Sequence, residues 1–488
     1  MTLDLAVILI LGGAAFLYAA LIRGRGRGWA LLVGSVVAVF WLQPSLPIRF
    51  SAYILQSTTV LLTIASWWLT RSPEASNRQA TWPEDRLAML LILGLVIAMA
   101  LNRYLGMDIR LTAYRPPAPL IVAAALAVLA MLALILARGL RSLNQRHLLS
   151  AAILIIVLIF TVLKSEPLAA TAAAVWRSAT GQDVALASIN DLAWLGFSYV
   201  AFRLIHTLRD RQTGQLPHLS LREYTTYVLF APAYIAGPID RAERFVVDLR
   251  QVPAMVGLDS ARFFAGGQRI IIGMFKKFII ADTLAQGLSL TPLNAQQATS
   301  AAGLWVLLYG YAFRLYFDFG GYTDIAIGLG MLFGVTLPEN FRRPYLSTTI
   351  TEFWQRWHIT LSNWARFYVF SPLSRALLRR KPRPSTTLII FASQLATMVV
   401  IGLWHGITWN FFMWGIWQGV ALFVHKQWSD RTRKWYRSLG DKPRQKQAWT
   451  LFSWFLTFQY VVLGWVWFMM PSLNSAVTTF GRLFGIGW

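Results

Sequence analysis

The stretch "LSAAILIIVLIFTVL" (residues 149–163) contains no charged side chain. Such runs recur along the chain, and several approach the ~20 residues that a helix needs to cross a bilayer. The strict alternation of polar and apolar residues that marks a membrane β-barrel is absent. We therefore predict an all-α polytopic integral membrane protein with roughly 11–14 transmembrane or re-entrant helices. The other runs are 5–22, 31–42, 52–69, 87–101 and 120–136.

Composition supports this class and narrows the partners. The 488 residues are 56% hydrophobic and 14% charged, whereas a soluble domain carries about a quarter charged residues. The net charge of +24 would suit a nucleic-acid partner, but the basic residues cluster in short loops between apolar runs. The positive-inside rule explains that pattern, so we expect membrane lipids and no nucleic acid as partners. The loops predicted to be cytoplasmic are 23–28, 137–147, 209–223, 374–385 and 425–447.

Two further features limit the chemistry. The chain has no Cys, which excludes disulfides, thiolate metal ligands and a cysteine nucleophile within it. Residues 1–22 lack a basic leader and a clear cleavage site, so we expect the first spanning helix there.

The chain changes character at about residue 185. Before it the expected helices are plain Leu/Ala/Val segments, whereas after it polar residues lie inside apolar segments. Such polar residues usually face a cavity or pathway, so we expect function in the second part.

The stretch "EFWQRWHITLSNWARFY" (352–368) places a histidine among bulky aromatics. Treated as one continuous helix over 352–365, it has a polar stripe with Glu352 and Arg356 at ion-pair spacing, followed by Thr360 and Asn363. Trp354 and His358 fall on the opposite, apolar face, where a neutral imidazole is expected. Taken alone, this stretch favours a structural histidine that one hydrogen bond satisfies in a helix contact.

A second histidine lies in "GLWHGITWNFFMWGIWQG" (402–419). His405 is predicted at the junction of two apolar runs, with glycines at four-residue spacing on both sides, which lets helices pack closely. The tryptophans of this stretch could line a tunnel or form an interfacial belt. Neither histidine has an acidic companion at a zinc-binding spacing, so no metal site is predicted.

The third stretch, "LYFDFGGYTDIAIGLGMLFG" (315–334), contains Asp318 and Asp324 within an apolar segment. An unpaired carboxylate there is costly, so each is expected to have a cationic partner and a supporting role. The expected partners are Arg314, Arg342, Arg343, Arg356 or a histidine. The glycine pair at 320 and 321 predicts a break or bend.

Residues 317–373, from "FDFGGYTDIAIG" to "FSPL", followed by "GLWHGITWNFFMWGIWQG", resemble the membrane-bound O-acyltransferase (MBOAT) family. The similarity is to the bacterial branch that holds alginate O-acetyltransferase and the teichoic-acid D-alanyl transfer protein. Residues 227–245 and 273–285 are similar to that branch as well. The resemblance implies helices 1–185 as a scaffold partly outside the family core, a catalytic core over 186–430, and a basic cytoplasmic loop with C-terminal transmembrane helices over 431–488.

The resemblance also implies a mechanism. The position of His405 is the expected catalytic residue and His358 its partner, in a membrane-embedded tunnel where a cytoplasmic thioester meets an extracytoplasmic hydroxyl. A neutral imidazole can take the hydroxyl proton during attack. The expected tunnel residues are Trp354, Trp357, Trp404, Arg356, Ser362, Asn363 and Asn410, of which the last three are candidate donors to the developing oxyanion.

The implied protein is an O-acyltransferase of the bacterial inner membrane. We expect no bound cofactor but a thioester co-substrate, acetyl-CoA or an acyl carrier protein. The expected acceptor is a hydroxyl of a cell-envelope polysaccharide, with a periplasmic acyltransferase as a further partner. D-alanyl transfer to a teichoic-acid-like polymer is the near alternative. A transporter or flippase of a lipid-linked sugar is the alternative of another class, and a non-catalytic scaffold is a third.

Overall fold

The computed structural model describes residues 4–71, 75–139, 143–255, 257 and 259–487. Within these ranges the regular structure consists of α-helices and short 3₁₀ or π segments, and no strand is present. The predicted all-α class is confirmed. The chain forms two compact units: Met1–Gln268 with Ala326–Leu337, and Arg269–Ile325 with Pro338–Trp488. The predicted boundaries near 185 and 430 stay predictions.

The first unit contains the helices predicted from the early apolar runs. Short apolar helices α1 and α2 are joined by the basic loop, and α8, α9 and α10 carry more polar residues. These helices are α1 (Leu5–Leu21), α2 (Gly26–Trp41), α3 (Ser51–Thr70), α4 (Ala75–Ala100), α5 (Pro119–Gly139), α6 (Gln145–Lys164), α7 (Glu166–Ala179), α8 (Phe197–Thr213), α9 (Leu221–Leu229) and α10 (Ala242–Gln251). Helix α11 (Ser260–Met274) begins in this unit and ends in the other.

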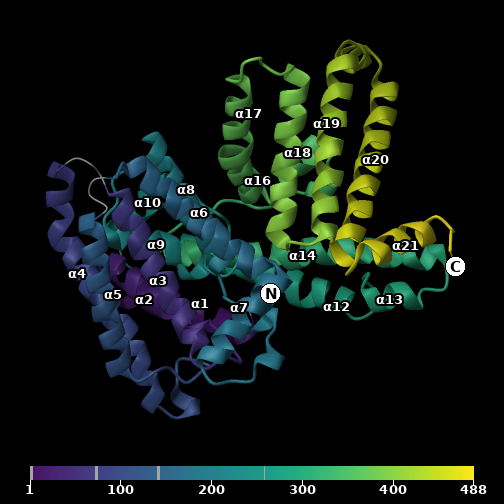
Figure 1. Cartoon of the computed structure of the whole chain (residues 1–488). Helices are drawn as coiled ribbons and strands as arrows, with labels where there is room; N and C mark the ends of the chain where they lie inside the picture. Colours follow the sequence, from purple (N-terminus) through teal and green to yellow (C-terminus); the bar gives the residue numbers. More distant parts are fainter. Residues whose placement is uncertain (1–3, 72–74, 140–142, 256, 258, 488) are drawn as a thin grey trace. The chain divides into compact units, whose positions relative to one another are not determined.

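The second unit contains a π segment after α11 and most of the long helix α14. Helices α17, α18, α19 and α20 stand side by side, as Figure 1 shows. The elements are the π segment Phe275–Ala281, α12 (Asp282–Ala285), α13 (Pro292–Gln297), α14 (Ala301–Leu332), α15 (Ile350–Arg356), α16 (Ile359–Ala365), the π segment Arg366–Phe370, α17 (Ser371–Leu378), α18 (Thr386–His405), α19 (Trp409–Ser438), α20 (Pro443–Met469) and α21 (Leu473–Leu483).

Among the described residues, six helices are long and apolar enough to cross a membrane. They make this a multi-pass membrane protein. The six stretches are Ser51–Thr70, Thr81–Tyr104, Pro119–Leu136, Gln145–Lys164, Thr386–His405 and Pro443–Met469. Helices α1 and α2 are shorter and apolar. The predicted total, which includes re-entrant segments, stays a prediction.

Glycines set how closely the helices approach. A Cβ on Gly415 of α19 would lie 2.7 Å from the Cα of Val399 in α18, so the expectation of close packing at the spaced glycines is confirmed. The break expected at Gly320 and Gly321 is wrong, because α14 runs unbroken through both. Gly321 instead lets α11 approach, since a Cβ there would lie 2.6 Å from the carbonyl oxygen of Gly273.

Candidate functional site

His358 lies at a break between two short helices, so the predicted continuous helix over 352–365 is wrong. Helix α15 ends at Arg356, and His358 adopts a left-handed conformation with φ 42° before α16 begins. Asn340 fills the gap: its carbonyl oxygen accepts from Ile359 N–H at 2.9 Å and its side chain from the Thr360 hydroxyl at 2.6 Å. A non-glycine residue at positive φ is uncommon and often marks a functional position.

His405 is the last residue of α18, at the junction that the sequence predicted. Gly406 follows in extended conformation, and the Thr408 side chain caps the start of α19 by accepting from Phe411 N–H. The turn between the two apolar helices is thus only a few residues long. It fixes the histidine at a helix end.

The two histidines line one small cavity in the second unit. Its volume is about 40 Å³, which exceeds the ~10–15 Å³ that a single water needs but excludes a long chain. The lining is otherwise aliphatic and aromatic, and among the described residues no Asp, Glu, Lys or Arg contributes to it. The lining residues are Leu315, Phe319, Trp354, Trp357, His358, Leu361, Ile401, His405, Trp414, Trp465 and Phe468.

Aromatic rings pack against the imidazoles of both His358 and His405. The ring centroid of His358 lies 4.7 Å from that of Phe319 and 5.9 Å from that of Trp404. The His405 ring lies 4.5 Å from Trp404 and 4.7 Å from Phe468. Trp404 therefore contacts both histidines.

Several buried polar atoms of this cavity have no hydrogen-bond partner among the described residues. His358 is 3% exposed, and neither ring nitrogen has a hydrogen-bond partner among the described residues. The indole N–H of Trp414, a residue 1% exposed, has none there either. An orphaned buried polar group costs about 1–3 kcal/mol. A ligand that bonds to these atoms would recover this cost.

Trp414 is one of the tryptophans of 402–419 that the sequence leaves as tunnel lining or interfacial belt, and the structure places it in the cavity lining. Its ring centroid lies 5.8 Å from that of His405. A signal was present: Asn410, Trp414 and Gln418 recur every four residues and form a buried face of α19. The Gln418 side chain accepts from the indole N–H of Trp354 at 3.2 Å.

The remaining predicted tunnel residues do not line the cavity. The Arg356–Glu352 ion pair is present at 2.6 Å. The Ser362 hydroxyl donates to the Trp357 carbonyl, and the Asn410 amide donates to the Met470 carbonyl at 2.5 Å. Asn363 is exposed. The structure thus does not bring the three expected oxyanion donors to the histidines.

Asp318 and Asp324 are ion-paired, as expected, but with other partners than those predicted. Lys277 pairs with Asp318, while Asp324 accepts from Arg269 at 2.8 Å and from Lys276 at 2.6 Å. The cations come from the end of α11 and the π segment, which the close approach at Gly321 brings against α14. These carboxylates support the packing of α14 beside the cavity residue Phe319.

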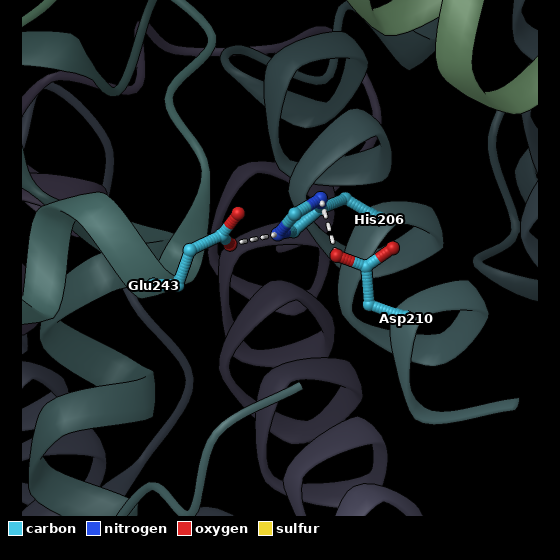
Figure 2. A group of neighbouring side chains, drawn as sticks. All are labelled: His206, Asp210 and Glu243. Atoms are coloured by element: carbon cyan, nitrogen blue, oxygen red, sulfur yellow. Dashed lines mark ion pairs between the residues drawn. The ribbon is translucent and has the colours of Figure 1, made fainter. Parts of the chain in front are cut away.

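The first unit holds another buried histidine, His206, with carboxylates on two sides (Figure 2). His206 Nδ1 lies 3.6 Å from Asp210 and Nε2 lies 3.8 Å from Glu243, a grouping of metal-ligand types. However, Nε2 accepts from Ala242 N–H at 3.1 Å, and Arg241 pairs with both carboxylates at 3.0 and 2.7 Å. The carboxylates face different ring nitrogens, so this geometry favours an ion-pair network over a single-ion site.

Comparison with known proteins locates the similarity in the part that contains both cavity histidines. Residues 145–469 match the MBOAT, membrane-bound O-acyltransferase family. The chain is 35% identical to the teichoic acid D-alanyltransferase of Streptococcus thermophilus over 286 residues, 57% of this chain and 68% of the relative. It is 34% identical to the peptidoglycan O-acetyltransferase of Helicobacter pylori over 266 residues, 54% of this chain and 47% of the relative.

A third relative is the probable alginate O-acetylase of Pseudomonas putida, 34% identical over 294 residues, 60% of this chain and 56% of the relative. The chain thus spans about half the length of these two acetylating relatives.

Proposed function

This chain belongs to the membrane-bound O-acyltransferase family, and from that premise we propose that it transfers an acetyl group from a thioester donor to a hydroxyl of a cell-envelope polysaccharide. The observation that carries the proposal is the small cavity lined by His358 and His405. Its apolar walls would exclude the water that otherwise hydrolyses a thioester.

His405 is proposed as the general base. The acceptor oxygen attacks the thioester carbonyl carbon while its proton passes to a ring nitrogen of His405. The new C–O bond forms, the C–S bond breaks, and the proton passes on to the departing thiolate. His358 is proposed as the second polar group at the reacting atoms, because its buried ring nitrogens have no partner among the described residues.

Trp414 is proposed as the donor to the oxyanion. The tetrahedral intermediate places negative charge on the former carbonyl oxygen, and a fixed N–H aimed at that oxygen stabilises it. Trp414 lines the cavity, and its buried indole N–H is unpartnered among the described residues. It takes the role that the sequence assigned to Asn410, Asn363 or Ser362.

The cavity favours acetyl over D-alanyl. A D-alanyl group carries an ammonium, which needs a carboxylate or several oxygen acceptors when buried. Among the described residues the lining has no acidic side chain, whereas a methyl group suits the Phe, Leu and Trp side chains. The similarity to a teichoic acid D-alanyltransferase keeps D-alanyl transfer as the second candidate.

The distribution of charge supports a proposal for the donor side and the location. Exposed basic residues gather in the stretch 425–447, which is predicted to be cytoplasmic. The prediction of a loop there is wrong, because most of the stretch belongs to the end of α19 and the start of α20. We propose that acetyl-CoA or an acidic acyl carrier protein delivers the thioester there, in a bacterial inner membrane. A periplasmic acyltransferase that passes the group on to the polymer is a proposed partner.

The test is acyl release from labelled acetyl-CoA by the purified protein in nanodiscs, with His405→Ala in parallel and folding checked by thermal melt. D-alanyl carrier protein serves as the second donor. Release by the wild-type protein that a folded variant loses would support the proposal. Equal release from both proteins would remove His405 from the mechanism, and no release from either donor would favour a transporter of lipid-linked sugars.

A further inference from the structure

A larger cavity lies in the first unit, and neither His358 nor His405 lines it. Its volume is about 360 Å³, and it is bounded by the end of α1, the start of α2, the start of α11 and the last residues of α14. Phe263, Leu332 and Phe333 give it an apolar side. Arg27, Arg262 and Tyr18 give it polar groups. A cavity of this size and mixture is typical of a small-ligand or head-group site.

Arg27 is a buried cation without a carboxylate. It is 3% exposed, and no acidic side chain lies within ion-pair distance among the described residues. Its Nε and Nη2 donate to the carbonyls of Ile22, Ala19 and Gly257 at 2.8, 2.9 and 3.0 Å. Nη1 makes no hydrogen bond within the described ranges. A buried guanidinium that lacks a counter-ion attracts an oxyanion.

Capping of α1 explains part of this arrangement. Ala19 and Ile22 lie at the C-terminal end of α1, where a basic side chain stabilises the last carbonyls. Capping does not explain Tyr18, which is 7% exposed, lines the same cavity and has a buried hydroxyl with no partner among the described residues. The Arg27 guanidinium lies 5.6 Å from the Tyr18 ring centroid. Both groups could therefore contact one ligand.

The balance of charge in the cavity is positive. Among the described residues the one carboxylate in its lining is Asp259. Its side chain is 59% exposed and lies 3.9 Å from Arg262, a pair that contributes little to stability. The two arginines, Arg262 and Arg27, against the one carboxylate of Asp259 give the lining a net charge of one positive unit, which a ligand with a single negative charge would balance. The exposed surface of α1 is rich in large apolar side chains, with Leu9 63% and Leu21 73% exposed. A water-soluble anion would gain nothing from that surface, whereas a lipid would.

From these observations we infer that the cavity binds the phosphate head group of an anionic phospholipid, with the Arg27 guanidinium and the Tyr18 hydroxyl as its direct contacts. The acyl chains would extend along the apolar surface of α1. Exposed Arg23 and Arg25 in the adjoining loop add to the attraction for an anionic membrane surface. The site involves neither cavity histidine, so its test is a binding measurement and does not depend on acyl transfer.

The experiment is native mass spectrometry of the full chain titrated with phosphatidylglycerol, with phosphatidylcholine as the zwitterionic comparison. The variants are Arg27→Gln, Tyr18→Phe and, as a matched control, Arg203→Gln. Arg203 is another buried arginine, 2% exposed, that donates to backbone carbonyls elsewhere in the unit. A second titration adds inorganic phosphate as competitor, and thermal melts verify folding.

We expect phosphatidylglycerol to bind in preference to phosphatidylcholine, with binding weakened at least about 10-fold in Arg27→Gln and a few-fold in Tyr18→Phe. The control should retain binding. Unchanged binding in folded Arg27→Gln would overturn the inference, as would displacement by inorganic phosphate without any lipid preference. If loss of the cap unfolds Arg27→Gln, Tyr18→Phe decides, because it removes one hydroxyl and preserves the ring.

Discussion

His206 and His358 are buried to the same degree, 1% and 3% exposed, in opposite surroundings. The nitrogens of His206 face Asp210, Glu243 and a backbone N–H, and Arg241 balances the carboxylates. The nitrogens of His358 meet no partner among the described residues, and the histidine lies in a strained backbone conformation beside aromatic rings.

The difference separates a histidine whose interactions the protein supplies from one whose nitrogens could still bond to a ligand. Around His206 the protein supplies every interaction, so its imidazole has no capacity left for a substrate. Around His358 the protein leaves polar atoms unsatisfied at a cost that a ligand would remove. Burial alone does not distinguish the two; hydrogen-bond partners do.

The largest effect is expected from replacing the unpartnered histidine. His358→Gln should lower acyl transfer by about 10²–10⁴-fold, because a group at the reacting atoms is lost. The matched change His206→Gln should leave activity per folded molecule within a few-fold. The activity of both variants is measured as release of the labelled acyl group from its donor. Thermal melts give the amount of folded protein, to which each activity is normalised. Equal losses in the two variants would mean that the contrast between the sites has no catalytic meaning.

The second largest effect on activity is expected from removing the indole N–H of Trp414. Trp414→Phe preserves an aromatic ring in the cavity wall but removes its N–H, so kcat should fall by about 10²-fold if that N–H stabilises the oxyanion. KM for the donor should change little, because the interaction forms mainly in the transition state. Steady-state kinetics separates the two constants. A rise in KM at constant kcat would assign Trp414 to binding instead.

Breaking the His206 network should act on stability rather than chemistry. Asp210→Asn removes the carboxylate that accepts from Arg241 at 3.0 Å and faces His206. We expect a loss of about 1–3 kcal/mol in the free energy of unfolding, since charged groups lose a buried partner. Thermal melts in detergent measure the shift, and acyl transfer by the folded fraction is the control. Lost activity without lost stability would contradict the structural role.

The smallest effect is a pH dependence of stability. His206 lies outside the candidate membrane spans, and burial lowers its pKa to about 4, opposed by Asp210 and helped by Arg241, with Glu243 also facing the ring. The unfolded chain binds this proton near pH 6.5 and the folded chain does not, so stability decreases as pH falls below that value.

The free energy of unfolding is expected to fall by about 1 kcal/mol between neutral pH and pH 5.5. This decrease should appear as a lower melting temperature of the wild-type protein that His206→Gln reduces. Identical pH profiles in the two proteins would show that His206 does not titrate in this way.

Composition and periodicity predicted the helical class and the early helices, because long apolar runs have few alternatives in a membrane. They also placed His405 at a helix junction, where two glycine-spaced runs meet. They failed at His358, since the break depends on Asn340, eighteen residues earlier in the chain. They failed likewise at Asp324, whose cations lie on another helix. Contacts between segments that are distant in the sequence do not show in its periodicity. Both errors arose because such contacts decide the structure at these two positions.

The aromatic wall around the two histidines has a consequence for the cell's energy supply. A reaction path that opens to water on both sides of a membrane would conduct protons and dissipate their gradient. The cavity of about 40 Å³ admits only a small group between its rings. Side chains that shield a thioester from hydrolysis would therefore also insulate the membrane electrically, so that acylation could proceed without a leak.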